Sequence, residues 1–237
     1  EDGKLQGYFE MIGIPHSTSS SAITSLTFQK FHCNQFLKNF DVNVAEAFLL
    51  RLEDKVDETD ILNKIGLPCF VKPTNAGSSY GITKVKSLKE LTPAIKHAFS
   101  YGNEIVIETN IKGREVTNGI FRNKEGLKTL PITEIISENE YFDYEAKYNG
   151  KSKEITPAEI NEEQTQNIKS LTNFIYKTLG MNGLVRMDYI VNENNIPFLI
   201  EINSVPGMSK ESIIPQMIKE DNKLIKDVLS DIINLKF

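Results

Sequence analysis

The stretch LVRMDYIVNENNIPFLIEIN, residues 184–203, decides the fold of this chain. Its two ends are rich in β-branched, aromatic and aliphatic residues, which predicts strands over 184–191 and 197–203. The polar run 192–195 between them has the composition of a turn. We therefore expect a β-hairpin near the C-terminal end.

Charged residues interrupt both apolar runs of this hairpin. Side chains alternate between the two faces of a strand, so every second residue shares a face. On the first strand these are Leu184, Arg186, Asp188 and Ile190, and on the second they are Leu199, Glu201 and Asn203. If the two faces coincide, Asp188, Glu201 and Asn203 converge beside Arg186.

Two interpretations of this convergence stay open. The first is a solvated sheet face on which Arg186 pairs with the acids. The second is a metal site, because two carboxylates about 4 Å apart repel by roughly 4 kcal/mol at an effective dielectric of 20, and Arg186 supplies a single positive charge. Two carboxylates and an amide oxygen suit Mg²⁺, which keeps positions for water and substrate phosphates. The second interpretation predicts a Mg–nucleotide phosphoryl-transfer site.

Length and composition limit the classes of protein to consider. The chain has 237 residues, enough for one large domain or two smaller ones. No apolar run approaches the ~20 residues of a membrane span, and no signal peptide is recognisable. The net charge of −5 gives generic nucleic-acid binding no help from the global field. Cys33 and Cys69 lack metal-ligand spacing, so we expect free thiols in a reducing cytosol.

Periodicity predicts alternating helices and strands along the rest of the chain. Helices are expected over about 5–12, 22–39, 92–99 and 162–179 and from about 222, and strands over about 67–73, 82–85, 104–108, 114–121 and 127–136. The segment 40–60 is polar and acidic, and its residues 53–58 are expected to form a solvated helix or loop. The last helix carries an apolar stripe that we expect in the core: Leu224, Ile225, Val228, Leu229, Ile232 and Ile233.

Three further features favour an anion-binding site. The glycine loop 77–81, GSSYG, offers backbone N–H groups to phosphates, although an ordinary hairpin turn would have the same composition. Lys72 lies in an apolar strand, where a lysine is costly unless it meets an anion, and Lys147 among aromatic residues is similar. The segment 203–215 leaves backbone amides open near Gly207, and its alternative is a plain strand-to-helix connection.

Together these segments resemble one family. The motifs are VKP at 71–73, GSSYG at 77–81, IET at 107–109, YFDYEAKY at 141–148, RMD at 186–188 and EINSVPGM at 201–208. Their order and spacing are similar to those of the D-alanine–D-alanine ligases of the ATP-grasp superfamily, and the likeness spans nearly the whole chain.

The resemblance implies an α+β fold of the ATP-grasp type, in which two α+β subdomains with antiparallel sheets enclose the nucleotide. Residues 1–29 would be the tail of an N-terminal domain whose first part is absent, 30–111 the central subdomain, and 112–237 the C-terminal subdomain with the metal site. The glutamate that the family uses for its first substrate has no counterpart here.

The resemblance also implies the reaction. A D-alanine carboxylate attacks the γ-phosphate of ATP to give an acyl phosphate, and the amine of a second D-alanine displaces phosphate. Asp188, Glu201 and Asn203 would bind two Mg²⁺ (or Mn²⁺), with Glu201 bridging them. The product would be the dipeptide of peptidoglycan in the cell wall.

The other roles follow position by position. Lys30, Lys72 and Lys147 would hold phosphates, Glu108, Thr109 and Ile111 would line the adenine pocket, and Glu115 would bind the ribose. Arg186 and the Gly207 amide would stabilise the oxyanion, and Ser212 and Ile213 would receive the carboxylate of the second D-alanine. Ser78 and Tyr148 would belong to the set that orients the absent glutamate.

Some positions depart from the family pattern. Thr18 stands at a common glycine, which puts the shape of that loop in doubt. Thr109 replaces a common lysine, and Asn75-Ala76 replace a more charged pair. Two alternatives therefore remain: a ligase with another acceptor, such as D-lactate or D-serine, and a catalytically silent nucleotide-binding fragment. We further expect two D-alanine molecules as partners, no nucleic acid or membrane, a cytoplasmic location, and a homodimer in the full-length protein.

Overall fold

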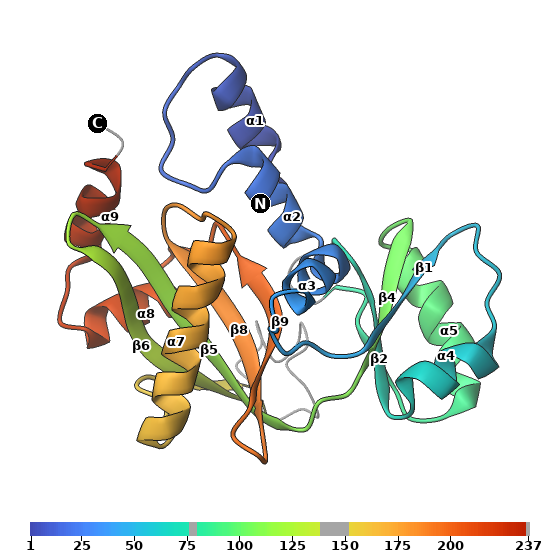
Figure 1. The fold of residues 1–237 in the computed structure, drawn as a ribbon. Helices are drawn as coiled ribbons and strands as arrows, with labels where there is room; N and C mark the ends of the chain where they lie inside the picture. Colours follow the sequence, from blue (N-terminus) through green and yellow to red (C-terminus); the bar gives the residue numbers. More distant parts are fainter. Residues whose placement is uncertain (76–79, 138–151, 236–237) are drawn as a thin grey trace.

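Two antiparallel sheets lie side by side in the computed structural model of the protein, which describes residues 1–75, 80–137 and 152–235 (Figure 1). One sheet has four strands in the order β1-β4-β2-β3, and the other has five in the order β7-β6-β5-β8-β9. The elements are α1 (Lys4–Met11), α2 (Ser21–Phe28), α3 (Lys30–Lys38), β1 (Ala47–Arg51), α4 (Glu58–Ile65), β2 (Cys69–Pro73), β3 (Thr83–Val85), α5 (Leu88–Phe99), β4 (Glu104–Thr109), β5 (Gly113–Asn123), β6 (Gly126–Ser137), β7 (Ser152–Ile155), α7 (Glu162–Thr178), β8 (Val185–Asn192), β9 (Pro197–Asn203), α8 (Ile213–Glu220) and α9 (Ile225–Ile233).

The predicted hairpin is the β8–β9 pair. The strands are antiparallel, and Asp188 lies opposite Glu201, so the charged faces coincide as expected. A bulge between Asp188 and Tyr189 breaks the alternation. Leu199 therefore pairs with Tyr189 and packs with it in the buried core, although it also borders the cleft that Glu201 lines, so the simple alternation expected for this strand does not hold along its whole length.

Helices cover both sheets. α7 packs on one face of the five-stranded sheet, where Ile168 and Ile175 are fully buried. It begins at a capping box in which Asn161 and Gln164 satisfy each other's backbone N–H groups. α8 and α9 form a second core with Phe121 and Leu130. α4 and α5 pack on the four-stranded sheet.

One predicted helix is divided in two. The segment 22–39 forms α2 and α3, which meet at Gln29 with φ −88° and ψ 89°. The Lys30 N–H group donates to the Thr74 carbonyl at the end of β2, 2.9 Å away, so a tertiary hydrogen bond accompanies the break. Because of the break, α3 starts beside the end of the inner strand β2 and carries Lys30 there.

Two boundaries differ from the prediction for local reasons. β1 lies inside the segment 40–60, because its short apolar run pairs with β4 along its whole length. α5 begins at Leu88, before the expected start, and contains Pro93. The Glu90 carboxylate accepts from Lys86 N at 2.7 Å and Ser87 Oγ at 3.0 Å, which stabilises the earlier turn.

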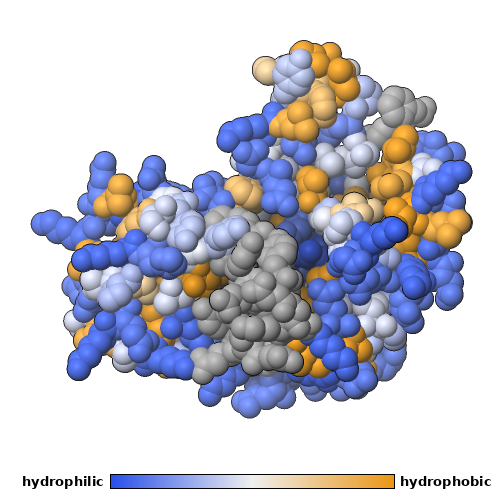
Figure 2. All heavy atoms as spheres, turned by 180° about the vertical axis from the view of Figure 1, so that it is seen from behind, coloured by the Kyte–Doolittle hydropathy of each residue, from blue (hydrophilic) through white to orange (hydrophobic). Residues whose placement is uncertain are grey.

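The apolar stripe of α9 is only partly buried, so the expectation that all of it forms core was wrong. Val228 and Ile232 are buried, whereas Leu224, Leu229 and Ile233 are exposed. The helix rests on the sheet along one narrow line of contact. Apolar side chains are also exposed on α1, at the protruding tip of the molecule (Figure 2): Leu5, Tyr8, Met11 and Ile12.

Both cysteines agree with the prediction of free thiols. Cys33 and Cys69 are buried and unbonded, and burial raises the pKa of Cys33 to about 12 and that of Cys69 to about 11. Within the described ranges, no helix combines the length and apolarity that a membrane crossing needs.

The N-terminal segment is attached to the five-stranded half through a tight backbone contact. Ser19 Oγ donates to the Asn182 carbonyl at 3.0 Å and accepts from Asn182 N at 3.1 Å. Gly183 follows with φ +73°, and a Cβ there would lie 2.1 Å from the Ser17 carbonyl oxygen. The approach of the two segments therefore requires glycine at this position.

We expect Gly183→Ala to lower the free energy of unfolding by about 2–4 kcal/mol, because it adds a backbone clash to the cost of positive φ. Gly180→Ala is the matched control, since Gly180 has φ +58° with nothing within 4 Å of its Cβ position. Urea unfolding of both variants measures the difference. Equal losses would show that the contact with Ser17 does not matter.

Candidate functional site

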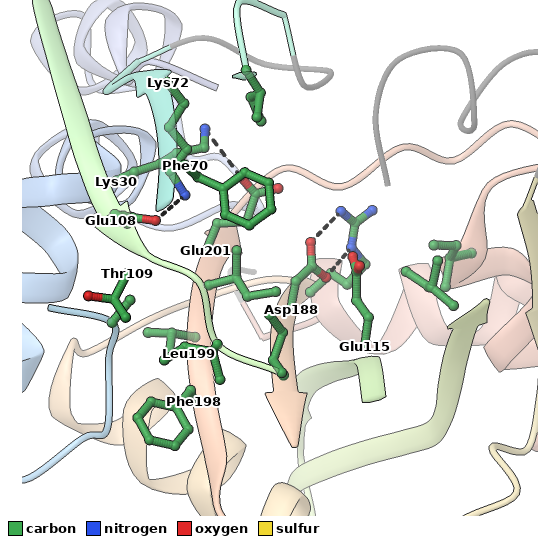
Figure 3. Close-up of a pocket in the computed structure, with 18 residues that line it drawn as sticks. Lys30, Phe70, Lys72, Glu108, Thr109, Glu115, Asp188, Phe198, Leu199 and Glu201 are labelled. Carbon is green, nitrogen blue, oxygen red and sulfur yellow. Dashed lines mark hydrogen bonds and ion pairs between the residues drawn. The ribbon is translucent and has the colours of Figure 1, made fainter. Parts of the chain in front are cut away.

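A cleft opens where the two sheets face each other, and most of the predicted site residues line it (Figure 3). Its empty space is about 1020 Å³, counted with the solvent that opens into it. The predicted residues on its walls are Lys30, Lys72, Glu108, Thr109, Ile111, Glu115, Arg186, Asp188, Glu201 and Ile213. They come from α3, both sheets, the β4–β5 connection and the start of α8.

The acid cluster of the hairpin forms as predicted. Arg186 binds Asp188 in two places, with Nε 2.9 Å from Oδ1 and Nη2 2.8 Å from Oδ2. Asn203 Nδ2 donates to Asp188 Oδ2 at 3.1 Å and lies 3.5 Å from Glu201 Oε1. The Asp188 and Arg186 side chains are only 10% and 14% exposed. The arrangement is a largely buried charge cluster rather than the solvated sheet face of the first interpretation.

A second cation belongs to the cluster: the resemblance placed Lys30 among the phosphate-binding residues, but its pairing with Glu201 was not predicted. Lys30 Nζ lies 3.2 Å from Glu201 Oε2, and the Lys30 side chain is 11% exposed. Asp188 and Glu201 are therefore balanced by Arg186 and Lys30, not by Arg186 alone. No local signal in the sequence identified Lys30, because its position depends on the break between α2 and α3.

Arg186 is held in its charged form. Burial alone would lower the pKa of its guanidinium, but Asp188 and the nearby carboxylates of Glu201 and Glu154 raise the pKa overall. This positive charge is fixed at the base of the cleft, next to the acids, where it can stabilise a developing oxyanion.

A buried ion pair forms the wall opposite the acid cluster. Lys72 Nζ on β2 lies 2.5 Å from Glu108 Oε2 on β4, and the two side chains are 7% and 10% exposed. The lysine of the apolar strand thus meets an anion, as its burial requires. In this structure the anion that Lys72 meets is the Glu108 carboxylate.

Apolar side chains complete the cleft, and the sequence analysis assigned them no role. They are Phe70, Ile82, Ile135, Ile190 and Phe198, among others. Phe70 precedes Lys72 by two residues, so strand alternation would have placed it on the same face. Ile135 lies at the site because it pairs with Glu115 across β5 and β6, and no local sequence pattern predicts that pairing. The Thr109 hydroxyl already has an acceptor within the protein, because its Oγ1 donates to the Ile65 carbonyl at 2.9 Å.

The remaining predicted residues lie outside this lining. Ser212 occupies the N-cap position of α8, but its side chain makes no capping hydrogen bond and its Oγ instead lies 2.8 Å from Ser209 Oγ. A Cβ on Gly207 would lie 2.9 Å from Ser212 Oγ, so Gly207 permits a close turn in this loop. Ser78, Lys147 and Tyr148 fall outside the described residues.

The cluster suits a divalent cation by its chemistry. Asp188 and Glu201 supply carboxylates, and the Asn203 amide would supply an oxygen after turning over, which is the donor set that Mg²⁺ prefers. In the described ranges no group of three or more His, Cys, Asp or Glu side chains is arranged to hold a metal ion, and this set consists of two carboxylates and one amide. The proximity of Lys30 to Glu201 is independent evidence that the cluster attracts positive charge.

Sequence comparison links the chain to ligases. The profile of the family described as "D-ala D-ala ligase C-terminus" matches residues 36–234. A D-alanine–D-alanine ligase of Phocaeicola vulgatus is 47% identical over 237 residues, which is all of this chain and 73% of the relative. A D-alanine–D-alanine ligase of Bacteroides fragilis is 48% identical with the same coverage.

Solved structures of ligases are similar to this chain as well. The VanG D-Ala:D-Ser ligase of Enterococcus faecalis superposes with a TM-score of 0.90 at 30% identity, covering the whole of this chain and 69% of the other. The D-alanine–D-alanine ligase of Bacillus anthracis gives a TM-score of 0.85 at 30% identity, covering 99% of this chain and 75% of the other, and it has also been solved in complex with ATP.

Proposed function

This chain belongs to the D-alanine–D-alanine ligase family, and we propose that it joins two molecules of D-alanine in an ATP-dependent reaction. Its fold is the α+β ATP-grasp fold of these ligases. The observation that supports the proposal best is the cleft between the sheets, which gathers four carboxylates and three basic side chains, with the Asn203 amide hydrogen-bonded to Asp188. The chain spans 73% of the length of the relatives named above.

The metal and nucleotide roles extend the proposal to single residues. Asp188, Glu201 and Asn203 would hold two Mg²⁺ (or Mn²⁺), and the metal would neutralise charge on the transferring phosphoryl group. Lys30, Lys72 and Lys147 would bind the phosphates. Glu108, Thr109 and Ile111 would contact the adenine, and Glu115 the ribose.

Charge supports these roles at Lys30 and Lys72. Each lysine lies in the cleft beside a carboxylate, Lys30 beside Glu201 and Lys72 beside Glu108. An arriving triphosphate would give both lysines a stronger anion, and both would keep a charge-assisted contact throughout. The apolar walls at Phe70 and Ile82 would pack against the base and exclude water.

The remaining roles concern the acyl transfer. The carboxylate of the first D-alanine attacks the γ-phosphate, and the amine of the second attacks the resulting acyl phosphate, releasing phosphate. Arg186 and the Gly207 amide would stabilise the oxyanion of the second step. Ser212 and Ile213 would receive the second D-alanine, while Ser78 and Tyr148 would orient the first-substrate glutamate of the family.

The proposal also covers the division into domains, the oligomeric state and the cellular location. We propose a tail over 1–29, a central subdomain over 30–111 and a C-terminal subdomain over 112–237. α3 belongs to the central subdomain by position, yet Cys33 and Leu37 pack in the core of the five-stranded sheet, so it would join the two. The full-length protein would be a homodimer in the cytoplasm, where free thiols persist.

The test is phosphate release from Mg-ATP with D-alanine, D-serine or D-lactate offered in turn, together with mass detection of the product. We expect release with D-alanine alone and the formation of D-alanyl-D-alanine. Release with D-serine or D-lactate as second substrate would point instead to a ligase with another acceptor. Nucleotide binding without release would favour a silent nucleotide-binding fragment.

A further inference from the structure

Thr117 contacts the acid cluster from the neighbouring strand. It lies on β5 directly opposite Asp188 of β8, and it is fully buried. Its Oγ1 donates to Asp188 Oδ1 over 2.6 Å, while the alternative acceptor, the Met187 carbonyl, is 3.3 Å away. The hydroxyl is therefore aimed at the carboxylate although a backbone oxygen is available to it.

The Asp188 carboxylate is saturated by protein donors. Oδ1 accepts from Thr117 Oγ1 and Arg186 Nε, and Oδ2 accepts from Arg186 Nη2 and Asn203 Nδ2. An ionised carboxylate offers about four acceptor positions, and all of them are used here. A cation could bind Asp188 only if one donor withdraws.

Asn203 is the donor that withdraws most readily. Turning its amide over removes Nδ2 from Asp188 Oδ2 and presents an oxygen in its place, so one motion frees a ligand and adds another. The Thr117 donor is buried in the sheet, and Arg186 is held by two bonds. Oδ1 therefore keeps both of its partners, whereas Oδ2 keeps Arg186 Nη2 and gains one free acceptor position.

We propose that Thr117 is a positioning residue that fixes Asp188 Oδ1 and so directs Oδ2 to the divalent cation. The inference rests on the proposed function, because it takes Asp188 to be a metal ligand. Hydrogen bonds that orient a ligating side chain commonly change metal affinity by about 10–100-fold. Thr117 would act on the metal through Asp188 without touching substrate.

The experiment compares two substitutions at one position. Thr117→Val removes the hydroxyl at nearly constant volume, and Thr117→Ser retains it. Thr172→Val is the matched control, since Thr172 is equally buried and hydrogen-bonded, to Ile168 O and Tyr189 Oη, but lies on α7 across the sheet. Mn²⁺ affinity is measured by electron paramagnetic resonance in the presence of a non-hydrolysable ATP analogue, and stability by urea unfolding.

We expect Thr117→Val to weaken Mn²⁺ binding about 10–100-fold, Thr117→Ser to restore most of it, and Thr172→Val to change stability without changing Mn²⁺ affinity. Asp188→Asn tests the metal site independently of Thr117. Normal Mn²⁺ binding by Thr117→Val would overturn the inference, and so would a Thr117→Ser variant that binds Mn²⁺ as weakly as Thr117→Val. In either case, weak Mn²⁺ binding by Asp188→Asn would still support the metal site. Normal binding by Asp188→Asn would overturn the metal site itself. Thr117→Ala gives the same comparison if the valine variant does not fold.

Discussion

Replacing Glu201 with glutamine is expected to lower kcat by about 1000-fold or more while the fold persists. Glutamine has the size of glutamate but lacks the negative charge that the proposed metals share. The change disturbs the ion pair with Lys30, 3.2 Å away, and the 3.5 Å contact from Asn203 Nδ2. The Glu201 side chain is 23% exposed and glutamine keeps an acceptor oxygen for Lys30, so the loss of stability should be small. Steady-state phosphate release and circular dichroism measure the two effects.

The matched control for this prediction is Glu193→Gln, an exposed glutamate in the turn of the same hairpin. It should leave kcat and stability unchanged. Mn²⁺ affinity in the presence of a non-hydrolysable ATP analogue should fall in Glu201→Gln and not in Glu193→Gln. Near-normal turnover by Glu201→Gln would remove Glu201 from the metal site and leave Asp188 and Asn203 without a sufficient partner.

The sequence predicted the site best where chemistry and local geometry coincide. Alternation along two adjacent strands was enough to bring Asp188, Glu201 and Asn203 together, because a short polar turn fixes the pairing of a hairpin. The burial of Lys72 likewise announced a nearby anion. Both inferences rest on residues close together in the sequence, where the two-residue period of a strand determines which face each side chain is on.

Features that depend on tertiary contacts were not predictable in the same way. The break at Gln29 carries no proline or glycine signal, yet it determines where Lys30 lies. The bulge beside Asp188 pairs Leu199 with Tyr189 in the core although the run itself reads as regular alternation. Thr117 looks like an ordinary strand threonine until the pairing of β5 with β8 places it against Asp188.

Replacing Lys72 with methionine is expected to lower the free energy of unfolding by about 3–5 kcal/mol, because it leaves the Glu108 carboxylate buried without its partner. The pair is 2.5 Å apart and almost wholly inaccessible to water. The matched control is Lys38→Met, which breaks the Lys38–Glu46 pair of 2.6 Å, whose side chains are 44% and 56% exposed. That change should cost less than about 1 kcal/mol. Urea unfolding at pH 7 measures both.

The double variant Lys72→Met/Glu108→Leu separates the structural role of the pair from its proposed role in binding nucleotide. Two apolar side chains of similar volume can replace a buried ion pair at little or no loss of stability, so most of the lost free energy of unfolding should return. Affinity for ATP should not return, because the cation proposed to hold the phosphates is still absent. Recovery of both quantities would mean that Lys72 serves only to neutralise Glu108. Recovery of stability alone would mean that the pair serves nucleotide binding beyond mutual neutralisation, through the Lys72 ammonium at the phosphates or the Glu108 carboxylate at the adenine. ATP affinity of the single variant Glu108→Gln, which keeps Lys72, separates these two contributions.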